Sequence, residues 1–257
     1  SSISLCDQIP TQFLDFVPSL GSNVFQESPE SFANVIVFAG NIYISFEEER
    51  ETIHYFMSTP ILNTLQIGSV DYLLENCFKY LDIECYFLQH DASIFKTYVD
   101  FCLRYLHSSQ HSAQVLGILI KVCKNEELML HELTRGIEQD LITLFGESIY
   151  PEPKALQLTD LIVSYHLDNK KISMIMQSVT FYNALKKGLS SKVSEVVSEC
   201  ARFLVTTSDR FFDIYNRMGI LQCLESSLEG CCYRERRFII LADVLIRLQL
   251  ASEQKFC

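Results

Sequence analysis

Histidine and carboxylate side chains at helical spacing are the residues of this chain that most resemble metal ligands. His131 and Glu132 match the start of the zinc-protease pattern H-E-x-x-H, but Arg135 stands where that pattern needs its second histidine. His107 and His111 are four residues apart, yet the serines around them are typical of a loop and a helix cap. The sequence therefore predicts no metal site.

Catalytic nucleophiles and cofactor loops give no recognisable pattern either. The adjacent Cys231 and Cys232 lack the second cysteine pair of a soft-metal site, and we interpret them as incidental thiols. The sequence contains no phosphate-binding loop, no G-x-S-x-G turn and no dinucleotide fingerprint. We therefore expect no cofactor and no enzyme activity. An enzyme with an unrecognised site stays open as an alternative, because distant residues can assemble a catalytic set.

Two short runs of charge are candidates for contact with a partner. The acidic run at residues 47–51 is typical of a helix start, where carboxylates favour the positive end of the helix dipole. The basic run Arg234-Glu235-Arg236-Arg237 precedes an apolar stretch and could meet a carboxylated or phosphorylated partner. Arg234, Arg236 and Arg237 are therefore candidate binding residues, with an ordinary solvated surface as the alternative interpretation.

The overall charge narrows the class of partner. A formal net charge of −11 argues against a nucleic-acid groove, because phosphate binding depends on clustered Lys and Arg. The charge is also uneven, since residues 1–78 hold ten carboxylates and one basic residue, whereas residues 170–257 hold thirteen basic residues against nine carboxylates. This asymmetry could orient an elongated protein partner, or it could reflect two differently solvated surfaces.

Cysteine usage and the absence of long apolar runs indicate the compartment. Cys77, Cys102, Cys123 and Cys200 occur singly inside apolar helical patterns, which favours buried free thiols over a disulfide framework. No uncharged apolar run reaches eighteen residues, and the sequence does not open on a signal-peptide pattern. We therefore expect a cytoplasmic or nuclear protein without a membrane partner.

The positions of proline and glycine indicate helices. With 48% hydrophobic residues but only nine Gly and six Pro, the chain suits long helices better than a sandwich or barrel. Residues 1–27 are interpreted as an irregular N-terminal arm, and Ser28-Pro29-Glu30 and Thr59-Pro60 as helix starts. The expected helix ends are at Gly68, Gly136, Gly188, Gly219 and Gly230.

A repeated apolar pattern is the strongest feature of the sequence. Apolar residues spaced i, i+4, i+7, which share one face of a helix, recur six times at steps of 39 to 43 residues. The six triples are Val35, Ala39, Ile42; Leu74, Phe78, Leu81; Val115, Leu119, Val122; Leu158, Ile162, Tyr165; Val197, Ala201, Leu204; and Phe238, Ala242, Leu245. A short and a longer amphipathic helix are expected after each triple, for example around Phe211 and Leu224. Such units of three helices must stack on one another to bury their apolar faces.

Residues 194–246 resemble the armadillo repeat. Met218 to Leu224 is similar to the Gly-apolar-apolar opening of the family's second helix, and Phe238 to Leu245 is similar to its third helix. Elsewhere the similarity rests on the period, which HEAT repeats share. The resemblance implies an all-α, right-handed α-solenoid of about five to six repeats over residues 28–257, forming a single domain. It also implies a scaffold whose third helices line a groove for other proteins or extended peptides.

The family's peptide receptors carry a recurring Asn and Trp on the third helix. The Asn position here is held by Asn41, Tyr80, Lys121, Ser164, Phe203 and Val244, and the Trp position by Val37, Asn76, Gly117, Asp160, Glu199 and Ile240. The first six are candidate groove residues, with a solvated or half-buried position as the alternative for each. Only Asn41 agrees with the receptor pattern, and the chain has no Trp. A nuclear-transport-receptor-like peptide binder is therefore the weaker alternative function.

The last predicted helix is apolar on nearly every side, from Phe238 to Ile246. A terminal repeat normally presents a polar face to water. We therefore expect this helix to be covered by residues 247–257, by a partner, by self-association or by further repeats.

Overall fold

The computed structural model describes residues 28–254 apart from 69–70, 88–91, 126–132, 134–135 and 169–172. Every element in this part of the chain is helical, and it contains no strand. The all-α prediction is therefore confirmed. The predicted arm at residues 1–27 and the His131-Glu132 pair lie outside the described residues.

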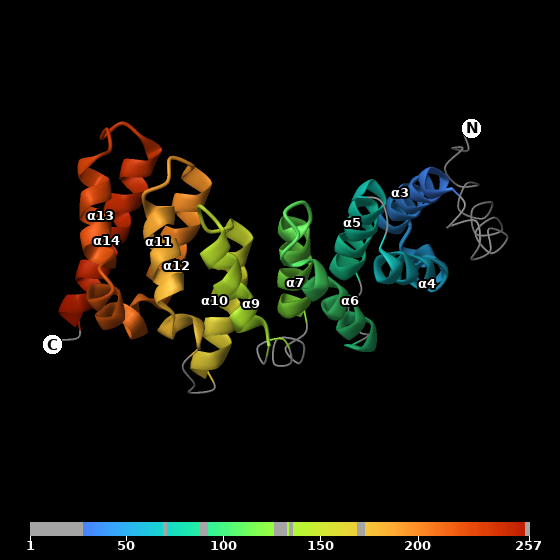
Figure 1. The fold of residues 1–257 in the computed structure, drawn as a ribbon, viewed down its shortest axis with the longest axis horizontal. Coiled ribbons are helices and arrows are strands. Elements are labelled where there is room, and N and C mark those ends of the chain that lie inside the picture. Colours follow the sequence, from blue (N-terminus) through green and yellow to red (C-terminus); the bar gives the residue numbers. More distant parts are fainter. Residues whose placement is uncertain are drawn as a thin grey trace. The chain divides into compact units, whose positions relative to one another are not determined.

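The chain forms two compact units, residues 1–125 and residues 126–257. The first unit contains α3 (Pro29–Ser45), a 3₁₀ helix η3 (Glu47–Glu49), α4 (Arg50–Ile67), α5 (Asp71–Phe87), α6 (Ala92–Tyr105) and α7 (Ser112–Asn125). In this unit α5 packs between α3 and α7, while α4 and α6 cover them as a second layer (Figure 1).

The second unit repeats this two-layer arrangement. It contains α9 (Ile137–Glu147), α10 (Pro153–Asp168), η4 (Ile175–Gln177), α11 (Val179–Leu189), α12 (Ser194–Arg217), α13 (Ile220–Glu229) and α14 (Arg236–Gln254). Helix α12 packs between α10 and α14, and α11 packs between α9 and α13 in the second layer (Figure 1). The prediction that residues 28–257 are one domain concerns how the two units are joined and stays a prediction.

The six helices that carry the predicted triples are α3, α5, α7, α10, α12 and α14, and we call them the third helices. In the first five, thirteen of the fifteen triple residues are buried, and Val35 and Tyr165 are half-buried. In α14 the prediction is wrong, because Phe238, Ala242 and Leu245 are only half-buried. Leu241, Val244 and Leu248 are buried instead, on the side of α14 that packs against α12 and α13.

The number of helices per repeat also differs from the prediction. Helix α12 runs without a break for 24 residues, from the fifth triple through Phe211, where a separate short helix was expected. No Gly or Pro occurs between Val197 and Arg217 to interrupt the hydrogen-bond ladder. The expected short helix is therefore fused to the preceding third helix, and each repeat of the second unit is built mainly from two helices.

Three of the five predicted helix ends, Gly68, Gly219 and Gly230, are confirmed, whereas Gly136 caps the start of α9 and Gly188 lies inside α11, one residue before its end. Helix α3 begins at Pro29 as expected, and Gly68 and Gly219 follow α4 and α12 with φ of 77° and 73°, a conformation that favours glycine. Thr59-Pro60 was wrong as a start signal, since Pro60 lies inside α4. That helix has already begun at Arg50, directly after η3 and within the acidic run, as the charge pattern at 47–51 predicted.

Gly188 is needed where α11 approaches α12. A Cβ atom at this position would lie 2.4 Å from the Cys200 Sγ atom and 2.8 Å from Pro151 Cγ. We expect Gly188→Ala to lower the free energy of unfolding by about 1–3 kcal/mol, because an added methyl group overpacks a closed core. Gly230→Ala is the control, since its Cβ would meet only ordinary contacts at 3.8 Å. Urea denaturation followed by circular dichroism compares the two, and equal stability would contradict the prediction.

Candidate functional site

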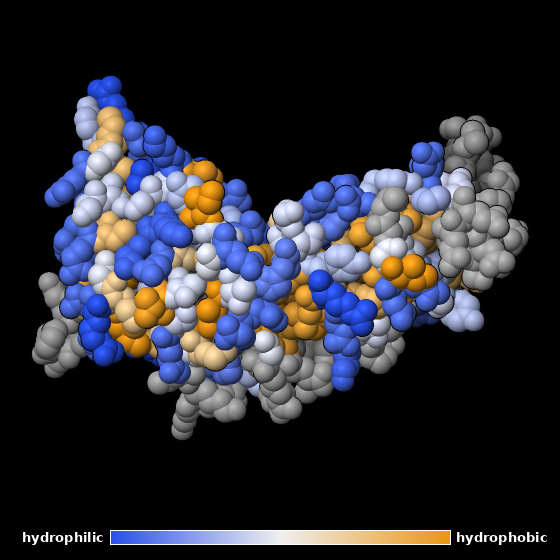
Figure 2. All heavy atoms as spheres, in the orientation of Figure 1, coloured by the Kyte–Doolittle hydropathy of each residue, from blue (hydrophilic) through white to orange (hydrophobic). Residues whose placement is uncertain are grey.

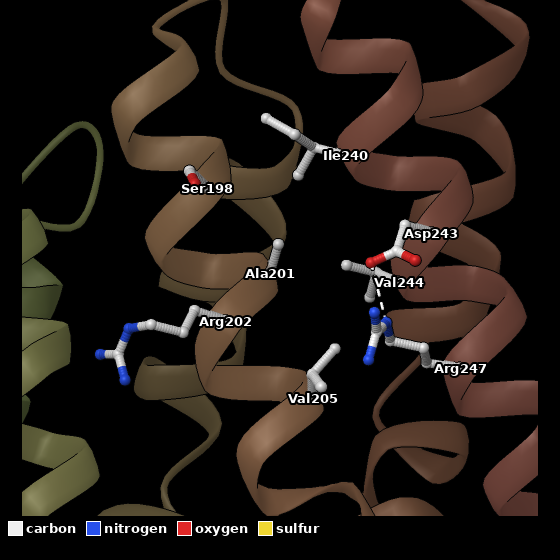
Figure 3. Close-up of a pocket in the computed structure, with 8 residues that line it drawn as sticks. All are labelled: Ser198, Ala201, Arg202, Val205, Ile240, Asp243, Val244 and Arg247. Carbon is white, nitrogen blue, oxygen red and sulfur yellow. Dashed lines mark hydrogen bonds and ion pairs between the residues drawn. The ribbon is translucent and has the colours of Figure 1, made fainter.

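A groove of about 270 Å³ lies between the third helices α12 and α14 (Figure 3). Its walls are Ser198, Ala201, Arg202 and Val205 on α12, and Ile240, Asp243, Val244 and Arg247 on α14. Steps of three and four residues place each set on one face of its helix. Ala201 and Val244 are 4% and 2% exposed and form the apolar floor. The groove therefore combines an apolar base with polar side chains along its edges.

The polar edge on α12 is held by ion pairs to the neighbouring third helix. Arg202 donates through Nη1 to Asp160 Oδ2 on α10 at 2.6 Å and through Nε to Glu199 Oε2 at 2.9 Å. Thr206 donates to the other Asp160 oxygen at 3.0 Å. Burial alone would lower the pKa of Arg202, but these hydrogen bonds outweigh it and raise the pKa. Arg202 is thus a fixed cation that turns away from α14 (Figure 3).

The polar edge on α14 is held less firmly than the edge on α12, because its ion pair lies within one helix and is exposed to water. Arg247 Nε donates to Asp243 Oδ2 at 2.8 Å, one helical turn away, and both side chains are 57% exposed. An exposed pair of this kind contributes at most about 1 kcal/mol, because water screens it. Asp243 and Arg247 can therefore exchange their mutual hydrogen bond for bonds to a ligand at small cost.

The first unit has a matching link between third helices. Lys121 Nζ on α7 lies 2.7 Å from Asp82 Oδ2 on α5, and it donates to the Asp82 main-chain carbonyl at 3.2 Å. Both side chains are partly exposed. Each unit therefore joins two third helices by an ion pair whose members are about one repeat apart in the sequence.

Comparison with known proteins gives the fold its name. Neither a protein-family model nor any curated protein matches the chain. Among solved structures, a designed armadillo repeat protein in complex with the peptide (KR)4 aligns with a TM-score of 0.62 at 13% identity, covering 96% of this chain and 98% of that one. This chain has an armadillo-like repeat fold. An engineered protein solved by the Northeast Structural Genomics Consortium also aligns, with a TM-score of 0.62 at 14% identity over 93% of this chain and 97% of that one.

The armadillo-like fold does not bring all six predicted groove residues to the surface. Tyr80, Phe203 and Val244 are at most 2% exposed and lie in the core. Asn41 and Ser164 are exposed, and Lys121 is half-buried in its ion pair with Asp82. A binding role for the accessible three stays a prediction, as does one for Val244, which lies in the floor of the groove. Tyr80 and Phe203 are buried away from any ligand.

The predicted basic run divides between two environments. Arg234 is exposed and donates to the Tyr233 hydroxyl at 3.1 Å. Arg236 and Arg237 instead line a separate hollow at the start of α14, together with Lys192. The structure therefore brings two of the three arginines together and leaves the third outside.

The groove residues that sequence reasoning missed are Ser198, Arg202 and Val205 on α12 and Asp243 and Arg247 on α14. They lie outside the apolar triples, and within each helix they are three or four residues apart. The signal that could have found Arg202 is a carboxylate one repeat earlier, since Asp160 precedes it by 42 residues. Opposite charges separated by one period meet on neighbouring third helices.

The residues considered for chemistry behave mainly as structural groups. Among the described residues no cluster of three or more His, Cys, Asp or Glu has the arrangement of a metal site. His111 is 4% exposed and packs against the rings of Phe78 and Tyr105. None of the helices in the described ranges is long and apolar enough to cross a membrane.

The predicted buried thiols are confirmed. Cys77, Cys102, Cys123 and Cys200 are free and buried. Burial raises the pKa of the Cys77 and Cys123 thiols to about 12, which keeps both protonated at neutral pH. Cys231 is half-buried and Cys232 is exposed, and both are free. The four buried thiols are therefore poor nucleophiles.

Proposed function

We propose that this chain is a non-catalytic interaction scaffold that binds an extended peptide segment of a partner protein in the groove between α12 and α14. The observation that carries the proposal is the groove itself, an apolar floor of Ala201 and Val244 between polar edges. Ligand sites commonly combine such a floor with a few polar groups that fix orientation. The designed armadillo protein with the same fold binds a peptide, which supports this class of ligand.

The side chains of the groove indicate which peptide it suits. Ile240 and Val205 are half-buried beside the floor and fit an aliphatic side chain. Asp243 and Arg247 can accept from and donate to the main chain of an extended segment. Because the groove is lined by one carboxylate, Asp243, and two guanidinium groups, we expect a peptide with an apolar anchor rather than the uniformly basic (KR)4 that the designed protein binds.

Peptide selection followed by substitution in the groove tests this function. A random peptide library is selected against the full chain, and affinities are measured by fluorescence anisotropy. Ile240→Glu is expected to weaken the selected peptides by about tenfold or more, because it places a charge beside the apolar floor. Ile239→Glu is the matched control, since Ile239 is the adjacent residue of α14, is 63% exposed and does not line the groove.

The two variants also define the outcome that would refute the proposal. Circular dichroism first verifies that both are folded. If no peptide is enriched, or if Ile239→Glu and Ile240→Glu weaken binding equally, the groove is not the binding site.

A further inference from the structure

A second hollow, of about 550 Å³, lies at the start of the same two helices that form the groove. It is lined by Lys192 and Ser194 at the beginning of α12, Gly230 after α13, and Glu235, Arg236 and Arg237 at the beginning of α14. Its volume falls in the range of small-ligand sites. Figure 2 shows hydrophilic residues over the tip of the loop that joins α13 to α14. The hollow is therefore a polar site, unlike the groove.

Helical spacing makes the hollow continuous with the groove. Ser194 precedes Ser198, Ala201 and Val205 by four, seven and eleven residues, which places it on the groove face of α12. Arg236 precedes Ile240 and Asp243 by four and seven residues, on the groove face of α14. The polar hollow and the apolar groove therefore follow one another along the same faces of α12 and α14.

The charge in the hollow is positive. Lys192, Arg236 and Arg237 face one carboxylate, Glu235, and within the described ranges none of the three cations forms an ion pair. Arg237 is held in place because its Nη2 donates to the Leu189 carbonyl at 3.3 Å, while its buried Nε has no hydrogen-bond partner there. These groups have donors to offer to an anion.

The start of α12 also leaves main-chain amides available to a ligand in the hollow. The residue before it, Val193, has no side chain that can accept from the first amides of the helix. No side chain caps these amides, and one carboxylate in the first turn, Glu195, offsets part of the positive end of the helix dipole. Together, the fixed guanidinium group of Arg237 and the two exposed cations favour a compact ligand with more than one negative charge.

We propose that this hollow binds a phosphorylated side chain of the same partner segment whose apolar residue occupies the groove. This inference rests on the proposed function. Arg pairs well with phosphate because its planar donors match the phosphate oxygens. From Ser194 to Ala201 the helix rises by about 10 Å, which an extended peptide spans with about three residues. The phosphorylated residue is therefore expected about three positions from the apolar anchor, on one side only.

Nucleic acid and anionic membranes fit the hollow less well. Both are extended polyanions that gain affinity from basic tracks covering several phosphates. Here three cations lie around one hollow, in a chain whose net charge is −11. A single phosphate group on a peptide can use the hollow without bringing further negative charge close to the acidic surface.

The test places phosphoserine at each position from one to six residues on either side of the apolar anchor of a selected peptide. Binding to the full chain is measured by fluorescence anisotropy at low and moderate salt. We expect phosphoserine at two to four positions on one side to strengthen binding by about tenfold, with a gain that shrinks as salt rises. The double variant Lys192→Gln, Arg236→Gln is expected to abolish this gain and to leave the unphosphorylated peptide unaffected.

Two controls separate this inference from the proposed function. Arg234→Gln removes a guanidinium group from the same run but outside the hollow, and it is expected to preserve the gain. Glu235→Gln removes the one carboxylate of the hollow and is expected to increase the gain. If unphosphorylated peptides bind in an Ile240-dependent way but phosphoserine gives no position-dependent gain, the hollow is not a phosphate site and the groove still stands.

Three further results would overturn the inference. The first is a gain that persists in the Lys192→Gln, Arg236→Gln variant. The second is an equal gain at every phosphoserine position, which would indicate general attraction rather than a site. The third is binding to phosphatidylserine vesicles that depends on Lys192 and Arg236 and exceeds phosphopeptide binding, which would favour a membrane surface. If no peptide binds in an Ile240-dependent way, the proposed function fails first.

Discussion

Phe203→Ala is expected to lower the free energy of unfolding by about 3–5 kcal/mol, because truncation of a buried phenylalanine leaves a cavity as well as losing apolar burial. Phe203 is fully buried on α12. Its ring packs edge-on against Phe181 of α11 at a centroid distance of 5.2 Å. It therefore joins the layer of third helices to the second layer. Urea denaturation followed by circular dichroism measures the loss.

Ser164→Ala is the matched control for Phe203→Ala, because Ser164 holds the same repeat position on α10 and is exposed. Its stability is expected to change by no more than about 0.5 kcal/mol. The sequence pattern assigned both residues to the groove, so the pair also tests that assignment. A Phe203→Ala variant that keeps its stability and loses only peptide binding would show that Phe203 faces the ligand.

The apolar triples could be predicted from the sequence because burial repeats with the period of the stack. Residues at i, i+4 and i+7 lie within about 60° of one another around a helix, so they enter the core together. The position six residues after the first member lies about 120° away, on the flank of the helix. Whether a side chain on that flank is buried depends on which neighbouring helices pack against it. Tyr80 and Phe203 are therefore buried, while Ser164 at the same position is exposed.

In the last helix, α14, the sequence pattern predicted the wrong buried face. Its triple of Phe238, Ala242 and Leu245 has the right spacing but is only half-buried. Helix α14 packs against α12 and α13, and the residues on that side are Leu241, Val244 and Leu248. Ile239, Ile246 and Leu250 are each more than half exposed. Periodicity thus identifies a helix and its apolar character, whereas the buried face depends on which neighbours are present.

The ion pairs between third helices could not be predicted from the apolar pattern, because each charged residue taken alone resembles an ordinary surface residue. Asp82 and Lys121 are 39 residues apart, and Asp160 and Arg202 are 42 apart. No local signal joins such pairs, but the repeat period does. Once a period of about forty residues is known, opposite charges at that spacing become candidates for contact between third helices.

Glu84→Ala is expected to destabilise the first unit by about 3–5 kcal/mol, because it breaks a buried cluster of hydrogen bonds around one carboxylate. Glu84 on α5 is completely buried, and its Oε1 lies 2.5 Å from His54 Nδ1 on α4. Its other oxygen accepts from the Tyr98 hydroxyl on α6, and the Tyr80 hydroxyl donates to Oε1 at 3.4 Å. One carboxylate thus connects three helices.

The two tyrosines make the cost of losing Glu84 large. Burial, together with the adjacent carboxylate, raises the pKa of Tyr80 and Tyr98 well above the usual range, so both hydroxyls stay protonated donors. Without Glu84 both donors lose this acceptor, and a buried donor without a partner costs about 1–3 kcal/mol. Glu84→Gln keeps an acceptor of the same size and is therefore expected to lose less stability than Glu84→Ala.

Glu75→Ala on the same helix is the control, since the Glu75 side chain is about half exposed and pairs with Lys79 one turn away, at 2.7 Å. Its loss is expected to cost less than about 0.5 kcal/mol. Hydrogen exchange measured by mass spectrometry locates the effect, with faster exchange expected in α4, α5 and α6 of Glu84→Ala. If Glu84→Ala and Glu75→Ala are equally stable, the cluster does not hold these helices together. The stability of the first unit must then come from its other contacts, chiefly apolar packing.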